Sequence, residues 1–347
     1  MTLDELVRAV HPVDTTATEA ARERHTLLAK PPGSLGRLET LGAQLAGITG
    51  RCPPPVPSAP TVVVAAGDHG VHARGVSDWP QSVTAAMVST VAGGGAAVNA
   101  IAGAVGATVT VLDVGTMATG DPPPGVRDRR VRPGTRDLTV EPALTPSECR
   151  AAIDAGAEVA GELVGAGTDL LATGEVGIAN TTPSACLIAA LTGVEPENVT
   201  GRGANLDDTR TSHKLDVVKA ALDRHGTDRD PIGVLASLGG LEHAALVGVI
   251  LAGAAARVPV VVDGVISGAA ALAAVALCPN LAGYLIPGHA SAEPGGRALS
   301  DRLGRPPLID LELRLGEGTG ALLAVPLVRS AAAVLTDMAT LDSVVSQ

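Results

Sequence analysis

The sequence predicts an α/β protein with a parallel sheet covered by helices on both faces and a small helical domain beside it. Two observations predict the sheet. After residue 60, short Val-rich runs alternate with Ala-rich segments of helical length, the order typical of βαβ units. These runs are apolar throughout, as strands are when both faces of a sheet are covered. The chain of 347 residues is 46% hydrophobic, so it can bury a large core although Phe is absent.

The elements are expected in three successive parts: helices, a linker, and strands separated by helices. Residues 3–50 predict helices with a break at 30–37 (KPPGSLGR), and 53–60 (PPPVPSAP) predict the linker. The expected strands are 61–66, 107–114, 168–172, 233–237, 258–262 and 283–286. We expect a last helix over 320–338 to pack with the N-terminal helices. Residues 1–55 with about 320–347 would then form the small helical domain, and 60–320 the large α/β domain.

The charge composition excludes several classes of partner. The formal net charge is −11, from 25 Lys and Arg against 36 Asp and Glu. Nucleic acids and anionic membrane surfaces select proteins with clustered positive charge. We therefore expect no nucleic-acid partner and no membrane partner. A phosphate ligand would need a locally positive site, such as the N–H groups at the start of a helix.

A cytoplasmic location is expected from the cysteines and the apolar segments. The four cysteines lie far apart and form no Cys-x-x-Cys pair, as is typical of reduced thiols in the cytosol. The N-terminus carries acidic residues and lacks the apolar core of a signal peptide. The longest apolar stretch, 246–286, is interrupted by Arg257, Pro259 and Asp263, which favours a buried α/β segment over a membrane span.

Polar, Gly-rich clusters follow the expected strands at 67–70 (GDHG), 174–177 (GEVG), 263–264 (DG) and 287–289 (PGH). In a parallel sheet the carboxyl ends of all strands lie at one edge, and ligands bind in the crevice beyond that edge. The spacing of the clusters therefore predicts a ligand site built from these four segments.

The segment 173–184 (TGEVGIANTTPS) predicts an anion site. After the strand, two glycines allow tight turns, Thr182 suits a helix N-cap and Pro183 the first helical position. Several backbone N–H groups would then point into one concavity. Glu175 is unusual in such a place, and it would hold a ribose hydroxyl or a base nitrogen. The alternative is an ordinary strand–turn–helix with an exposed Glu.

Two further segments carry candidate side chains. In 201–214 (GRGANLDDTRTSHK) the third glycine of the dinucleotide fingerprint is missing, and no Walker A loop occurs in the chain. Lys214 either binds phosphate or is a solvated lysine at a helix start. In 315–321 (LGEGTGA) Glu317 stands between two glycines before an apolar helix. Apolar surroundings raise the pKa of a Glu and make it a better base. The alternative is a linker with an incidental Glu.

A metal site is the remaining possibility for the charged residues. Asp68, His69 and His72 offer a minimal ligand set, but a hydrogen-bonded structural cluster is the favoured interpretation. The same two interpretations apply to His289 and Glu293. The G-x-S-x-G sequence of a serine nucleophile is absent. We expect no metal and no cofactor, and we keep a metal-dependent phosphohydrolase as an alternative function.

Eight stretches in order resemble one family: KPPGSLGRLE (30–39), GDHGV (67–71), GEVGIANTTPSA (174–185), GANL (203–206), KLDVV (214–218), VDGVIS (262–267), HASAE (289–293) and RLGEGTGA (314–321). The chain is similar to the nicotinate-nucleotide:dimethylbenzimidazole phosphoribosyltransferases. The resemblance implies a Rossmann-like sheet, a small domain from both termini, and a homodimer. It implies transfer of the phosphoribosyl group of nicotinate mononucleotide to a benzimidazole-type base, which releases nicotinate and forms an α-ribazole 5'-phosphate for cobalamin.

The resemblance also assigns residues. Glu317 is the implied general base, and Glu175 is the second catalytic carboxylate, near base and ribose. The implied nucleotide- and phosphate-binding residues are Gly177, Asn180, Thr181, Gly203, Lys214, Asp263 and Ser291, and the implied base-binding residues are Trp79, Met87, Val176 and Leu315. No metal is implied, because the leaving pyridinium already carries positive charge.

The chain departs from the family pattern in the base pocket. Well-known members have Ser and Gln at the places held here by Trp79 and Met87. Trp79 can stack on an aromatic base, and Met87 provides an adaptable apolar wall. The acceptor thus stays open between dimethylbenzimidazole, benzimidazole, adenine and a phenol. A nucleotide-binding protein without activity is a third reading, against which both Glu317 and Glu175 argue.

Overall fold

The protein is built on one six-stranded parallel sheet. The structure, a computed structural model, describes residues 2–203, 206–226 and 230–346. The strands are β1 (Pro60–Gly67), β2 (Thr108–Gly115), β3 (Val126–Asp128), β4 (Leu170–Val176), β5 (Val260–Val262) and β6 (Leu285–Pro287). Their order is β3-β2-β1-β4-β5-β6, with every pair parallel. The predicted α/β fold is confirmed.

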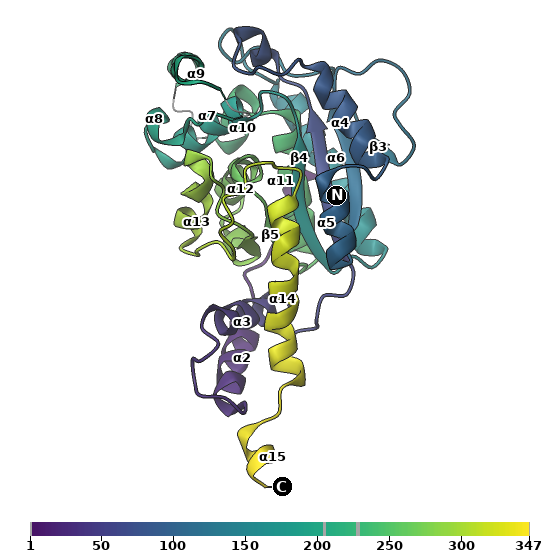
Figure 1. The fold of residues 1–347 in the computed structure, drawn as a ribbon, viewed down its shortest axis with the longest axis vertical. Helices are drawn as coiled ribbons and strands as arrows, with labels where there is room; N and C mark the ends of the chain where they lie inside the picture. The colour runs from purple at the N-terminus through teal and green to yellow at the C-terminus, as the bar shows by residue number, and fades with distance from the viewer. Residues whose placement is uncertain (1, 204–205, 227–229, 347) are drawn as a thin grey trace.

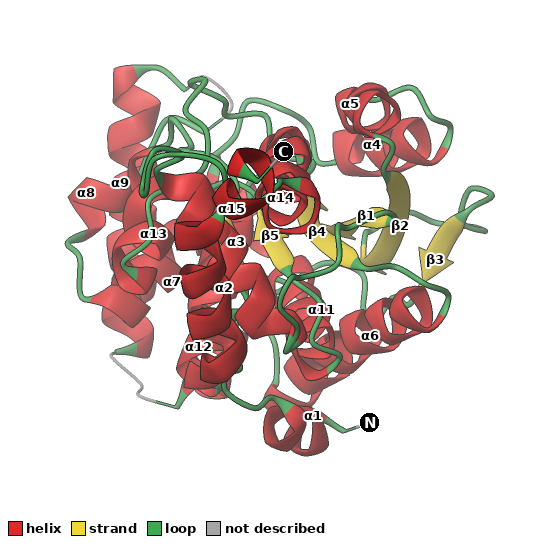
Figure 2. Ribbon diagram, turned by 90° about the horizontal axis from the view of Figure 1, so that it is seen from below, coloured by secondary structure: helices red, strands yellow, loops and turns green. Residues whose placement is uncertain are grey.

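Alternate residues of the central strand face two separate cores. Val63 and Ala65 belong to the core under α6 (Pro146–Gly165), α11 (Leu241–Ala255) and α12 (Val265–Leu277). Val62 and Val64 belong to the core under α4 (Ser82–Ala92), α5 (Ala97–Val105) and α14 (Thr319–Asp337). Figure 2 shows these helices on opposite faces of the sheet. The period of two along a strand therefore explains why the strands are apolar at every position.

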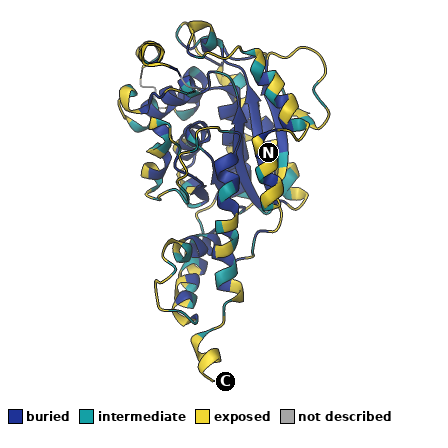
Figure 3. Ribbon diagram, in the orientation of Figure 1, coloured by how far each residue is buried: buried dark blue, intermediate teal, exposed yellow. Residues whose placement is uncertain are grey.

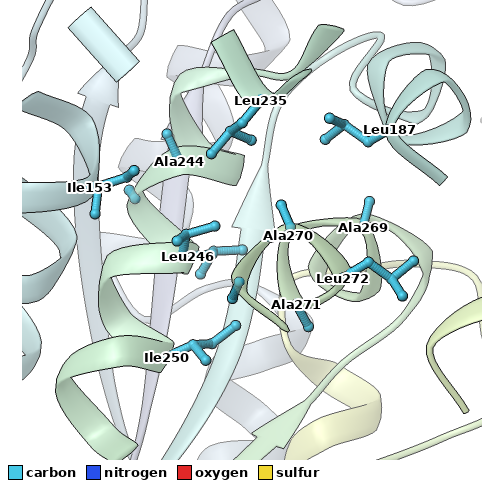
Figure 4. Packing of buried hydrophobic residues seen from close by; sticks show 14 of the residues in the cluster. Ile153, Leu187, Leu235, Ala244, Leu246, Ile250, Ala269, Ala270, Ala271 and Leu272 are labelled. Carbon is cyan, nitrogen blue, oxygen red and sulfur yellow. The ribbon is translucent and has the colours of Figure 1, made fainter. Parts of the chain in front are cut away.

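Small residues take the place of aromatic ones in the larger core. Leu246 and Ile250 of α11 lie among Ala269, Ala270 and Ala271 of α12 (Figure 4). On the other side of α11, a β-carbon at Gly248 would collide with the backbone of Ile153 in α6. Close helix approach lets Ala, Val and Leu fill a core without Phe.

The lower part of the molecule in Figure 1 contains α2 (Thr15–Leu27), α3 (Arg37–Thr49) and the end of α14. Some of their buried residues form a separate small cluster, Ala17, Ala21, Ala43, Ala46 and Leu335. Other buried residues of α3 join the two large cores, namely Leu41, Leu45 and Ile48. The helix α1 (Leu3–Ala9) instead contributes Leu3 and Leu6 to the larger core. Burial in Figure 3 follows the same division, with the C-terminal α15 (Leu341–Val345) exposed. The limits 1–55 with 320–347 and 60–320 stay a prediction.

In the sequence, the remaining helices lie between β4 and α14. They are α7 (Thr181–Thr192), α8 (Pro196–Val199), α9 (Asp208–His225), α10 (Pro231–Leu238) and α13 (Ala298–Leu303), with 3-10 turns at Pro279–Gly283 and Pro294–Arg297. A further 3-10 turn, Gly70–Arg74, follows β1. Several of these helices surround the ends of the strands, where the ligand site was predicted.

Three local predictions were wrong. The stretch 233–237 is part of α10 and not a strand: Pro231 occupies the first turn, and the side chain of Asp230 caps the N–H groups of Ile232 and Gly233. A short apolar run does not distinguish a buried strand from a buried helix. The edge strand β3 was missed because it has three residues and no apolar run. The helix α7 begins at Thr181 with Asn180 at its N-cap, two residues earlier than expected.

Two apolar helical stretches have the length and composition of a membrane span, Ser82–Val105 and Thr319–Asp337. The first consists of α4 and α5 with a break between them, and the second is α14, which packs on the sheet and on α3. Core helices of globular proteins pass the same test, so this observation is weak. The apolar stretch 246–286 is buried in α11, β5 and α12, as predicted.

Candidate active site

A cavity of about 690 Å³ lies beyond the carboxyl ends of the strands. This volume is in the range of small-molecule sites. Its walls come from the loop before α4 and α4 itself, from the β4–α7 turn, from the start of α12 and from two late loops. They include Trp79, Met87, Glu175, Val176, Gly177, Asn180, Thr181, Gly203, Gly264, His289, Ser291, Glu293, Glu312, Arg314, Leu315 and Glu317. Three of the four Gly-rich clusters thus line the cavity, at 174–177, 263–264 and 287–289. The cluster 67–70 does not line it, although the backbone oxygen of Gly67 lies against Gly177.

The β4–α7 turn brings Glu175 to the cavity wall. Glu175 is the penultimate residue of β4, and its buried Oε2 accepts a hydrogen bond from Nδ2 of Asn180. A β-carbon at Gly177 would lie 2.5 Å from the backbone oxygen of Gly67, so only glycine fits there. Ala179 has φ of 77°, a left-handed conformation that is unfavourable for a residue with a side chain. Strain of this kind is concentrated at functional sites.

Some backbone N–H groups of the predicted anion site in this turn already have partners within the protein. The N–H of Ile178 donates to Oγ1 of Thr84 at 3.1 Å, and those of Asn180 and Thr182 donate to carbonyl groups within the turn. These three groups are therefore committed to the protein. The expectation that several N–H groups of this turn face a ligand can therefore apply only to the others in 177–182 and stays a prediction.

Glu317 reaches the same cavity from a glycine-flanked loop before α14. Its φ is 62°, and its Oε2 accepts from the N–H of Val98 at 3.3 Å. The loop is held by Asp263, whose two carboxylate oxygens accept from the N–H groups of Gly318 at 3.2 Å and Ala321 at 2.9 Å. Asp263 was predicted to bind nucleotide; its carboxylate instead caps α14 behind the cavity wall. It acts on the site by holding the loop that carries Glu317.

The two carboxylates titrate above the usual range of Glu. Burial, and then the negative charges of Asp263 and Glu242, raise the pKa of Glu175 to about 8. Burial also raises the pKa of Glu317. Glu175 is therefore largely protonated at neutral pH and can donate a hydrogen bond. Glu317 is a carboxylate with increased basicity, suited to accept a proton.

Lys214 lies behind the wall formed by Gly203. Its side chain is fully buried in α9, and its Nζ donates to Oγ1 of Thr181 at 2.8 Å and to the backbone oxygen of Gly201 at 3.1 Å. The interpretation as a solvated lysine at a helix start is wrong. Burial lowers its pKa to about 8. The adjacent Ala204 and Asn205 of the GANL stretch lie outside the described residues.

Three charged residues of the wall were not predicted to bind substrate: His289 and Glu293 were considered only as metal ligands or a structural cluster, and Arg314 received no role. The Oε2 of Glu293 accepts from the N–H of Gly203 at 3.3 Å, and Nε2 of His289 lies 3.4 Å from Oδ1 of Asp263. Burial would lower the pKa of His289, but the contact with Asp263 raises it. Arg314 lines the cavity beside Leu315. Each stands in a stretch that carries the family resemblance, which was the available signal.

A further part of the cavity wall is apolar, and two of its side chains are exposed to solvent. All four predicted base-binding residues line it: Trp79, Met87, Val176 and Leu315. The side chains of Trp79 and Leu315 are 53% and 59% exposed. The backbone oxygen of Trp79 contacts Nε2 of His72 at 2.8 Å, which anchors the loop.

The candidate metal ligands at 68–72 face different partners. Asp68 accepts from the N–H of Met117 at 2.7 Å, His69 contacts Glu242, and His72 contacts the Trp79 backbone. Within residues 2–203, 206–226 and 230–346, no group of three His, Cys, Asp or Glu residues is placed to hold a metal ion. These residues form hydrogen bonds and ion pairs within the protein.

Comparison with known proteins gives the class first. Residues 10–345 match a family model described as "Phosphoribosyltransferase", and the chain is a phosphoribosyltransferase. A nicotinate-nucleotide–dimethylbenzimidazole phosphoribosyltransferase from Salinispora tropica is 52% identical, covering 99% of this chain and 98% of the relative. An enzyme of the same name from Chloroflexus aggregans is 48% identical, covering 97% and 96%.

A solved structure is similar over nearly the whole chain. The crystal structure of this phosphoribosyltransferase from Thermus thermophilus superposes with a TM-score of 0.92 at 44% identity, covering 96% of this chain and 99% of that chain. The chain belongs to the nicotinate-nucleotide–dimethylbenzimidazole phosphoribosyltransferase family.

Proposed function

We propose that this protein transfers the phosphoribosyl group of nicotinate mononucleotide to a benzimidazole-type base, releasing nicotinate and forming an α-ribazole 5'-phosphate. The observation that carries the proposal is the pair of buried carboxylates, Glu175 and Glu317, on one cavity in a chain of this family. A cavity that only binds a phosphate has no use for two buried acids, because each repels an anion and costs free energy to bury.

Glu317 is proposed as the general base. One nitrogen of the benzimidazole attacks C1 of the ribose while the other nitrogen loses its proton to the Glu317 carboxylate. The bond from C1 to the nicotinate nitrogen breaks, and its electron pair neutralises the pyridinium as nicotinate leaves. Attack from the opposite face inverts C1 from β to α. The raised pKa of Glu317 favours this proton transfer.

Glu175 and the nucleotide wall are proposed to position the ribose phosphate. A protonated Glu175 donates a hydrogen bond to the ribose or base, while Gly177, Asn180, Thr181, Gly203 and Ser291 surround the nucleotide. Lys214 provides positive charge from behind Gly203. Arg314 adds a second cation at the cavity wall. Both compensate locally for the negative net charge of the chain.

The acceptor is proposed to be dimethylbenzimidazole or a close analogue. The exposed Trp79 and the adjacent Met87 form a wall that selects a flat apolar ring by stacking and contact. Adenine and phenols are the alternatives, and the same wall would accept them with less apolar contact.

We also propose a cytoplasmic homodimer. The stretch of α4 and α5 is strongly apolar, yet only 28% of its most apolar 18-residue window is buried in one copy. An apolar surface of this kind favours a second copy of the chain as its cover. The reduced cysteines agree with a cytoplasmic enzyme.

The test is incubation of the protein with nicotinate mononucleotide and dimethylbenzimidazole, with chromatographic measurement of nicotinate and α-ribazole phosphate. Equal amounts of both products are expected, and neither should form without the base. Nicotinate release without base would show hydrolysis and contradict the proposal. Benzimidazole, adenine and a phenol, tested in parallel, rank the acceptors.

A further inference from the structure

A second cluster of charged side chains lies buried behind the β4–α7 turn. Glu242, in the first turn of α11, is enclosed between two histidines: its Oε1 is 3.1 Å from Nε2 of His69 and 2.7 Å from Nδ1 of His243. All three side chains are inaccessible to solvent. Burial alone would raise the pKa of Glu242, but the two histidines lower it by more than burial raises it. The net pKa is below the ordinary value, so Glu242 is ionised. A buried ion pair contributes little net stability, so a role in the site is worth seeking.

Contacts connect this cluster to the active site. Nε2 of His243 lies 2.9 Å from Oγ of Ser184, and that hydroxyl donates to the backbone oxygen of Asn180 at 2.7 Å. The side chain of Asn180 in turn donates to the carboxyl of Glu175. A continuous chain of polar contacts thus runs from Glu242 to Glu175.

The protons along this chain have one arrangement that satisfies both contacts of Ser184. The single hydroxyl proton goes to Asn180, so Ser184 accepts a proton from Nε2 of His243. Nδ1 of His243 lies 2.7 Å from Oε1 of Glu242. The buried carboxylate of Glu242 therefore holds the ring of His243, and the ring orients the hydroxyl of Ser184.

We propose that Glu242, His243 and Ser184 are positioning residues, which hold Asn180 and through it the carboxyl of Glu175 in the orientation that transfer needs. The inference rests on the proposed role of Glu175. The turn needs such support because Ala179, directly before Asn180, is held in the left-handed conformation. A strained turn persists only when contacts from outside fix it.

Ser184→Ala tests the inference, because it removes only one hydroxyl. We expect kcat to fall about tenfold, the usual size of coupling within one hydrogen-bond network, and KM for nicotinate mononucleotide to stay within about twofold. Thr192→Val is the matched control, since its hydroxyl also donates to the carbonyl four residues earlier on α7 but contacts no histidine. This control should keep the parent kcat. Equal kcat values for the two variants would overturn the inference.

A double-mutant cycle separates positioning from general destabilisation. In an Asn180→Ala background Ser184→Ala should have no further effect on kcat, because the group that it positions is gone. The isosteric Glu175→Gln background serves the same purpose if Asn180→Ala does not fold. The same tenfold loss in these backgrounds would overturn the inference. A parent protein that makes no α-ribazole phosphate would instead refute the proposed function.

Discussion

The two walls of the cavity differ in how firmly the fold holds them. On the carboxylate wall Glu175, Glu317 and Lys214 are buried, and each has a hydrogen-bond partner in the protein. On the base wall Trp79 and Leu315 are more than half exposed. The residues proposed for the transfer chemistry are thus fixed by burial and hydrogen bonds, whereas two of those proposed to contact the acceptor are exposed and less constrained by the fold.

Glu317→Gln should have the largest effect. The amide keeps shape but cannot accept a proton, so kcat should fall by about 10²–10⁴ while nucleotide affinity is nearly unchanged. Glu317→Asp should keep partial activity. Steady-state kinetics measure both variants, with circular dichroism as the check of folding. Turnover of Glu317→Gln within about threefold of the parent would transfer the role of base to Glu175.

The dependence of activity on pH should reflect the ionisation of both Glu317 and Glu175. Glu317 must lose its proton to act, so kcat/KM should rise through a pKa above the ordinary 4.5. Protonated Glu175 and charged Lys214 are both lost near pH 8, so activity should decline as pH rises through about 8. The acid limb should change about tenfold per pH unit, and the alkaline limb up to about a hundredfold, because two groups lose a proton there. A profile that stays flat from pH 7 to pH 10 would exclude both groups.

Lys214→Met should weaken nucleotide binding by about 1–3 kcal/mol, the range for a lost charged hydrogen bond. Methionine retains the length of the side chain and avoids a cavity. We expect Lys214 to contribute more to nucleotide binding than the N–H groups of 177–182, because part of these already donate within the protein. Titration with nicotinate mononucleotide gives the Kd, and an unchanged Kd would remove Lys214 from the site.

Trp79→Ala should affect only the binding of the base. It should weaken dimethylbenzimidazole binding by about 0.5–1.5 kcal/mol, measured as a higher KM for the base, and leave the KM for the nucleotide unaffected. Because the chain has one Trp, its fluorescence reports on this wall alone. Saturating base should quench or shift the emission. An unchanged spectrum would place the base away from Trp79.

The smallest effect is expected from chelation. The candidate ligands at 68–72 are engaged by separate partners within the described residues, so EDTA should leave the rate unchanged. Loss of turnover with EDTA and its recovery with Mg²⁺ or Zn²⁺ would favour the metal-dependent phosphohydrolase.

The sequence by itself determined the sheet and the edge where the ligand site lies. Val-rich runs buried on both faces predict parallel strands, and the Gly-rich clusters that follow them must meet at one edge, because all strand ends point the same way. Five of the six expected strands are present, and the exception at 233–237 failed because the capping by Asp230 is a local contact that hydrophobicity does not record.

Only the tertiary structure decided what each charged residue does. Lys214 and Asp263 were both expected to bind nucleotide, and only the fold shows that Lys214 lies behind Gly203 and that the carboxylate of Asp263 caps α14. The chain from Glu242 to Glu175 joins residues 67 positions apart, and no local pattern announces it. Hydrogen-bond partners and pKa values depend on which segments the fold brings together and how completely it excludes water.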